Sequence, residues 1–237
     1  AKNTQPSPAS PPMLSPAALA LAIGLLPITV VHLCYALSVQ AGHVPLCLPY
    51  WEGCTSISRA ARHGAANHLF KAGMLPIAGL MLVFWWLCAH WLRTLNAQRR
   101  RRIATMQALG VTGALFLILY ATFLGVDGDV YRWLRRYGVT VYFSFTVLAQ
   151  MLMASVLDRG GLRGTLIGLC ATMLLLGLAS IPLQHLFPDK DVPLNALEWA
   201  YALLMSLGFA AVGLAWWWHG VRLHMPVAPS YGVPPKG

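Results

Sequence analysis

Two stretches of this 237-residue chain, residues 40–72 and 126–138, collect side chains that could bind a phosphate group. Arginine pairs with phosphate through two parallel N–H bonds, which makes it the residue best suited to that contact. Serine hydroxyls can add further hydrogen bonds. We therefore predict a binding site for an anionic group formed by Ser56, Ser58, Arg59, Arg62, Arg132, Arg135 and Arg136.

The first of these stretches also contains Cys47 and Cys54, with six residues between them. In an oxidising compartment such a pair can form a local disulfide. Because the same stretch holds His43, His63 and His68, a metal site is the competing interpretation, but the spacing matches no zinc signature. We favour the disulfide and predict no metal site, and two free thiols remain the third alternative.

Four histidines lie in or at the ends of apolar stretches, two at each of two levels, as the axial ligands of two haems would. His90 and His219 stand beside runs of tryptophan, and such rings are typical of anchors at a membrane surface. We therefore favour anchoring and predict no cofactor. A haem would use His32, His90, His185 and His219.

The sequence lacks the common hydrolytic patterns, because His-Glu-x-x-His, Gly-x-Ser-x-Gly and phosphate-binding glycine loops do not occur in it. An acid–base set for chemistry on lipid would have to combine Ser56 or Ser58 with His63 or His68. The seven acidic residues fall in loops or at the ends of apolar stretches, which argues against intramembrane acid–base chemistry and proton-coupled transport. We expect a protein that is not an enzyme.

The elements that must position these residues are membrane spans. Hydrophobic residues make up 57% of the chain and charged residues 10%, whereas soluble domains carry about 25% charged residues. Six segments reach the length of about 20 apolar residues that a helix needs to cross a bilayer, and none alternates as a membrane strand would. We predict an all-α integral membrane protein with a six-helix transmembrane domain over residues 14–220 and spans at about 14–38, 73–92, 104–124, 139–157, 165–187 and 196–219.

The net charge of +10 divides unevenly between the two sides. Six spans place both termini on one side, with ten Lys and Arg against one acid, while the other side has seven against six. The Lys/Arg-rich side is expected to be cytoplasmic. Arg99–Arg102 belongs to that signal, so we predict no nucleic-acid partner. We expect a bacterial inner (plasma) membrane location with cytoplasmic termini.

The outer connection, residues 39–72, is long and rich in aromatic and apolar residues, which predicts an ordered cap that residues 126–138 would complete. Asn195 followed by Glu198 indicates a helix start with an acidic third position. Proline-rich residues 1–13 and residues 221–237 predict a flexible arm and a flexible tail.

The cap carries a pattern by which the chain resembles a known family. Pro49 and Tyr50 are followed by Ser56, Ile57 and Ser58, and Phe70 leads into the second span. With the order of six spans, this pattern over about residues 43–74 resembles the FRAG/DRAM/Sfk-like superfamily of six-span membrane proteins. The resemblance implies a role in lipid remodelling of glycolipid-anchored proteins, phospholipid organisation or autophagy.

These features predict a multi-pass membrane protein that binds or organises lipid, with membrane lipids as partners and an anionic headgroup site on the non-cytoplasmic face. One alternative is an accessory subunit of a larger complex, whose partners would be other membrane protein subunits. A haem-binding membrane protein and a lipid-modifying enzyme are the further alternatives.

Overall fold

The structure is a computed structural model that describes residues 15–221. The predicted arm 1–13 and all of the tail 221–237 except Val221 lie outside the described residues. The described part is helical and contains no strand, and six of its helices are long and apolar enough to span a membrane. These are α1 (Pro16–Gln40), α4 (Gly64–Leu95), α5 (Arg100–Phe123), α6 (Asp129–Val156), α7 (Gly161–Leu186) and α8 (Asp191–Trp218). The predicted fold class, an all-α membrane protein with six spans, is confirmed.

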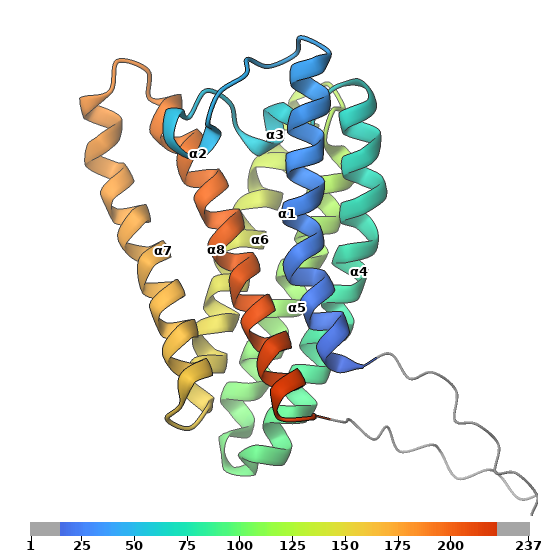
Figure 1. The fold of residues 1–237 in the computed structure, drawn as a ribbon, viewed down its shortest axis with the longest axis vertical. Coiled ribbons are helices and arrows are strands. Elements are labelled where there is room, and N and C mark those ends of the chain that lie inside the picture. Colours follow the sequence, from blue (N-terminus) through green and yellow to red (C-terminus); the bar gives the residue numbers. More distant parts are fainter. Residues whose placement is uncertain (1–14, 222–237) are drawn as a thin grey trace, which may run out of the picture.

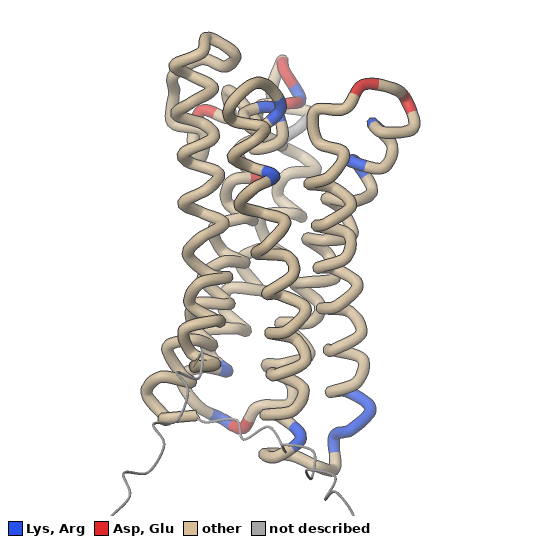
Figure 2. Tube along the Cα trace, turned by 90° about the vertical axis from the view of Figure 1, so that its right-hand side faces the viewer, with Lys and Arg blue, Asp and Glu red and all other residues tan. Residues whose placement is uncertain are grey.

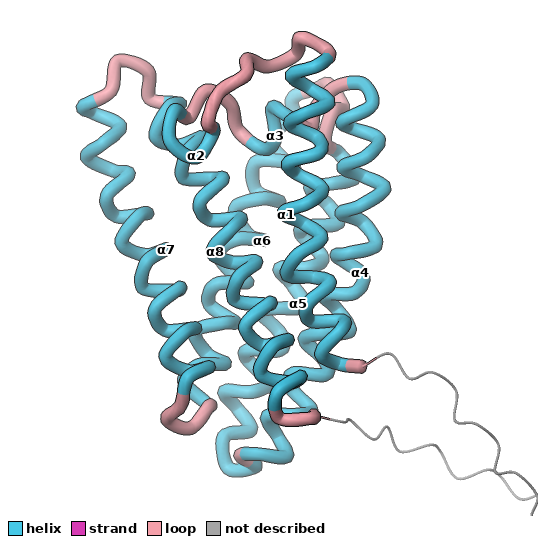
Figure 3. Tube along the Cα trace, viewed as in Figure 1, coloured by secondary structure: helices cyan, strands magenta, loops and turns pink. Residues whose placement is uncertain are grey.

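Three shorter helices complete the described chain: α2 (Pro49–Glu52), α3 (Ile57–Ala60) and the 3₁₀ turn η1 (Ala97–Arg99). Loops occur only at the two ends of the bundle (Figure 3). This arrangement meets the requirement that backbone at membrane depth satisfy its own hydrogen bonds.

Several helices begin earlier than the hydropathy predicts. The helix of the second span begins at Gly64 and that of the fourth at Asp129, so parts of the predicted loops 39–72 and 126–138 are helical. The last helix begins at Asp191, so Asn195 lies inside it and the prediction of Asn195 as the N-cap is wrong. Hydropathy marks where side chains become polar, whereas backbone hydrogen bonding continues a helix beyond that point.

The helices pack as neighbours in pairs, α1 with α4 and α8, and α5 with α4 and α6 (Figure 1). Helix α7 lies at the edge, against α8 and α6. The core holds an aromatic cluster in which the Phe84 ring lies 5.1 Å from that of Trp85 and 5.2 Å from that of Phe209. Gly110 lets α5 approach the face of the Trp85 ring.

The two ends of the bundle differ in chemistry. Residues 41–63, which we call the cap, include α2 and α3 and close one end (Figure 1). Acidic residues gather near that end, and the Arg99–Arg102 run lies at the other (Figure 2). The start of α1 and the end of α8 also lie at the end away from the cap.

Candidate functional site

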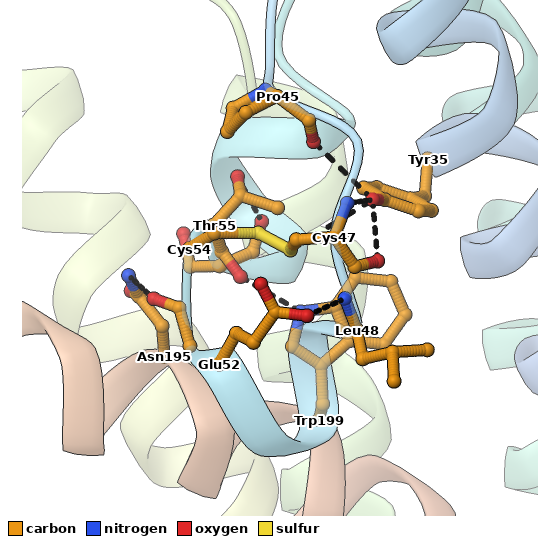
Figure 4. Close-up of a disulfide and its surroundings, with 11 residues drawn as sticks. Tyr35, Pro45, Cys47, Leu48, Glu52, Cys54, Thr55, Asn195 and Trp199 are labelled. Atoms are coloured by element: carbon orange, nitrogen blue, oxygen red, sulfur yellow. Dashed lines mark hydrogen bonds between the residues drawn. A yellow bond between two sulfur atoms is a disulfide. The ribbon is translucent and has the colours of Figure 1, made fainter.

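The cap is closed on itself by a disulfide between Cys47 and Cys54, whose Cα atoms are 6.6 Å apart (Figure 4). The Tyr35 hydroxyl accepts a hydrogen bond from the Cys47 N–H (2.8 Å) and donates to the Cys47 carbonyl (2.9 Å). The Glu52 carboxylate accepts from the Leu48 N–H at 2.9 Å and so closes the first turn of α2. The bridge therefore lies in an ordered segment, tied to α1 through Tyr35.

Replacing both Cys47 and Cys54 with serine should lower the free energy of unfolding by about 2–3 kcal/mol, because the bridge closes a short loop in the unfolded chain. Alkylation of the denatured wild type, counted by mass spectrometry, should modify three cysteines without reductant (Cys34, Cys88 and Cys170) and five after reduction. Five modifications without reductant would show that the bridge does not form.

One face of α8 holds the cap in place. The Asn195 side chain donates to the Gly53 carbonyl (2.8 Å), and the Trp199 indole donates to the Thr55 carbonyl (2.9 Å) (Figure 4). Arg59 forms an ion pair with Asp191 at 3.3 Å. Residues three, four, seven and eight apart share a face of a helix, so Asp191, Asn195, Glu198 and Trp199 form a single docking stripe.

The short helix α3 positions the two predicted serines differently. Ser56 is its N-cap, and the Ser56 hydroxyl accepts from the Arg59 N–H at 3.1 Å. The Ser58 hydroxyl lies 3.0 Å from the Ser56 hydroxyl, and the Ser58 backbone N–H donates to the Glu198 carboxylate at 3.2 Å. Ser56 therefore caps α3, while the backbone of Ser58 binds the carboxylate of Glu198 on α8.

The five predicted arginines do not form a single cluster. Arg59 pairs with Asp191, and Arg132 pairs with Asp129 at 3.4 Å, both at the surface. Arg135 donates to the Phe123 and Val126 carbonyls and so fastens the turn between α5 and α6. The exposed Arg136 side chain makes no ion pair or hydrogen bond within residues 15–221.

Arg62 differs from the other four in the burial of its guanidinium nitrogen, although it lies near Arg135. Its side chain is half-buried, and its Nε is buried without a hydrogen-bond partner among the described residues. It lies within electrostatic range of Arg135, Glu198 and Tyr120. A guanidinium whose donors are not used by the protein is available to an anion.

Two residues of this site, Glu198 and Tyr120, are not among the binding residues predicted from the sequence, which places Glu198 only in a helix start. Glu198 lines a cavity of about 40 Å³ between the helices. The Tyr120 hydroxyl, in a side chain only 4% exposed, makes no well-aligned hydrogen bond within the described part of the chain, although the Ser58 side chain lies beside it. The remaining wall is mainly apolar and includes Val31, Phe70 and Met74. Arg62, Ser58, Tyr120 and Glu198 form what we call the polar site, above an apolar cavity.

His32 lies on α1 beneath the cap. Its Nδ1 is 2.7 Å from the Ile28 carbonyl, and its Nε2 is 3.2 Å from the Tyr50 hydroxyl. Because a carbonyl oxygen only accepts, Nδ1 donates to Ile28, and a second hydrogen bond joins Nε2 to the Tyr50 hydroxyl. Burial raises the pKa of Tyr50, which keeps this hydroxyl a donor. A haem at His32 would have to displace a hydrogen bond that the protein already makes.

The other histidines lie apart from the polar site. The His90 ring stacks on Trp86 with centroids 6.0 Å apart, and His185 and His219 are exposed. The His63 ring faces that of His43 at 5.5 Å, and no hydrogen bond joins His63 or His68 to either serine in the described structure. Within residues 15–221 no group of three or more His, Cys, Asp or Glu side chains could hold a metal ion.

The geometry at the cap end combines a half-buried guanidinium, two hydroxyls and a carboxylate with an apolar cavity. Such an arrangement can hold a polar group by hydrogen bonds and charge while apolar surface receives whatever is attached to it. Comparison with known protein families, with curated proteins and with solved structures finds no match to this chain.

Proposed function

We propose that this multi-pass membrane protein binds a lipid and holds its phosphate-bearing headgroup at the polar site. The observation that carries the proposal is the buried Nε of Arg62, which has no hydrogen-bond partner among the described residues. It lies within electrostatic range of the buried Tyr120 hydroxyl, which the Ser58 side chain approaches without a well-aligned hydrogen bond. Buried polar groups without partners are rare in folded proteins, and each calls for an explanation. A phosphate oxygen would accept hydrogen bonds from both.

The depth of the polar site suits a headgroup. Glu198 lies seven residues into the last helix from Asp191, which at the helical rise of 1.5 Å per residue is about 10 Å from its start. Tyr120 lies one turn before the end of α5 at Phe123. The site therefore lies close to the level at which headgroups meet hydrocarbon.

An acyl chain has a place beside the cavity. A groove of about 300 Å³ runs between α6 and α7, lined by Val147, Met151, Cys170 and Leu174 among others. Phe143 lines both this groove and the cavity, so the two spaces adjoin at this side chain. The resemblance of the sequence over about residues 43–74 to a superfamily linked to phospholipid organisation is a further reason to propose a lipid ligand.

Replacing Arg62 with alanine should reduce co-purified phospholipid and weaken its binding by about 10- to 100-fold, because a charged hydrogen bond of about 1.5–3 kcal/mol is lost. Lipid mass spectrometry of the purified protein measures the first effect, and titration of delipidated protein measures the second. Arg136→Ala is the matched control, since it removes an exposed arginine at the same end. Equal lipid content in the Arg62→Ala variant and the control would contradict the proposal.

A second candidate, an accessory subunit of a larger membrane complex, is supported by α7. This helix is the least buried of the six, and its Leu175, Leu178 and Ile181 are more than half exposed. In a membrane such a face contacts either lipid or a partner helix. A native gel after extraction in mild detergent distinguishes the two candidates, because a subunit would migrate as a large assembly of fixed composition.

A further inference from the structure

Glu198 is the feature of the polar site that a purely anionic ligand leaves unexplained. Its carboxylate accepts one hydrogen bond, from the Ser58 N–H, and forms no ion pair within 4 Å in the described structure. Arg59 is nearby but is paired with Asp191, and Arg62 acts on Glu198 only through longer-range charge. A carboxylate at this depth of a spanning helix is costly without a cation, and such residues mark ligand sites by default.

The cavity walls suit a small cation. Phe70, Tyr120, Tyr142 and Phe143 line the same space as Glu198. Aromatic faces attract cations through their electron-rich surfaces. The cavity is of about 40 Å³, and a single water needs about 10–15 Å³ on this measure. The space therefore holds about three waters, which is room for a primary ammonium. The N–H groups of a primary ammonium can donate to the Glu198 carboxylate, whereas a trimethylammonium group has no N–H to donate.

We propose that the polar site recognises a zwitterionic phosphoethanolamine headgroup, with the primary ammonium on Glu198 and the phosphate on Arg62. This inference rests on the proposed lipid-binding function and adds the class of headgroup. The two side chains come from α8 and from the segment between α3 and α4, so both ends of the headgroup contact the closed cap end. A phosphoglycerol headgroup lacks the cation that Glu198 requires.

The test measures binding of phosphatidylethanolamine, its N-methyl and N,N-dimethyl forms, phosphatidylcholine and phosphatidylglycerol to the full-length delipidated protein by native mass spectrometry. The wild type should prefer phosphatidylethanolamine at least tenfold over phosphatidylcholine and phosphatidylglycerol, with affinity falling at each added methyl group. This series requires no variant, so it decides the inference even where a substitution disturbs folding.

Glu198→Gln keeps an acceptor for Ser58 but removes the charge, and it should abolish the preference while phosphatidylglycerol still binds. Glu198→Asp should retain the preference. The matched control is Glu52→Gln, which changes an exposed cap glutamate that also accepts a backbone hydrogen bond. An unchanged preference in Glu198→Gln would overturn the inference.

The remaining outcomes separate the two proposals. The wild type could bind phosphatidylglycerol as tightly as phosphatidylethanolamine, and Arg62→Ala could bind neither. This outcome would overturn the proposed preference for a zwitterionic headgroup and support the proposed lipid site. Loss of neither lipid in Arg62→Ala overturns both proposals. Soluble phosphoethanolamine that competes at the same affinity as the lipid supports the headgroup chemistry but overturns the membrane lipid as its source.

Discussion

Replacing Gly53 with alanine should detach the cap from α8 and lower the free energy of unfolding by about 2–5 kcal/mol. Gly53 ends α2 with a φ of +58°, a conformation that L side chains adopt at a cost. A Cβ at this position would lie 2.0 Å from the backbone oxygen of Val192. Because the obstacle is backbone, the segment must move, and the hydrogen bond from Asn195 to the Gly53 carbonyl is lost with it.

Thermal unfolding in detergent measures this loss, and Gly42→Ala is its matched control. Gly42 also has a positive φ, +72°, but a Cβ there meets nothing within 4 Å. The control should therefore show the conformational cost alone, about 1–2 kcal/mol. Equal destabilisation by the two variants would mean that Gly53 does not contact α8 as described.

The second large effect is expected from Trp199→Ala, which should cost about 3–5 kcal/mol of stability. The Trp199 side chain is fully buried, and its ring lies 5.3–5.9 Å from those of His32, Tyr35 and Tyr50. Its removal leaves a void beneath the cap and an unpaired Thr55 carbonyl. The cap then loses the contact between the Tyr50 and Trp199 rings.

The decrease in melting temperature of Trp199→Ala is compared with that of Trp217→Ala on the same helix. Trp217 is 68% exposed, so its replacement should change stability by less than about 0.5 kcal/mol. Limited proteolysis should also cut the cap of Trp199→Ala faster than that of the control. Similar melting temperatures for the two variants would show that Trp199 does not support the cap.

The six spans could be predicted from the sequence because a bilayer imposes a length and a hydropathy on each of them. The ends of the helices could not. Gly64 and Asp129 begin helices among polar residues, where hydropathy carries no signal but the backbone still forms its own hydrogen bonds. The prediction placed Arg132, Arg135 and Arg136 in an ordered cap loop, whereas they lie on the helix that begins at Asp129, which fixes which way each one points.

The candidate site could be predicted in part. Residue type identified Arg62 and Ser58, but it could not separate them from Arg59, whose partner Asp191 lies 132 positions away along the chain. The Asn195 side chain is typical of an N-cap, so the sequence predicts a helix start that includes Glu198 and gives no sign that Glu198 belongs to the site. The spacing of Asp191, Asn195, Glu198 and Trp199 on one helical face is the signal that could have revealed a buried docking surface.

The attachment of the cap to α8 also sets an order of events during synthesis. The cap is synthesised after the first span. Glu198, whose carboxylate accepts the hydrogen bond from the Ser58 N–H, lies 140 residues after Ser58 in the chain. At elongation rates of about 5–20 residues per second, the cap must wait about 7–28 s for its docking surface. During that interval the cap is held by α1, by its own contacts and by the hydrogen bond from Asn67 of α4 to the Ala61 carbonyl. A quality-control protease would therefore meet the cap undocked from α8 until the last helix is inserted.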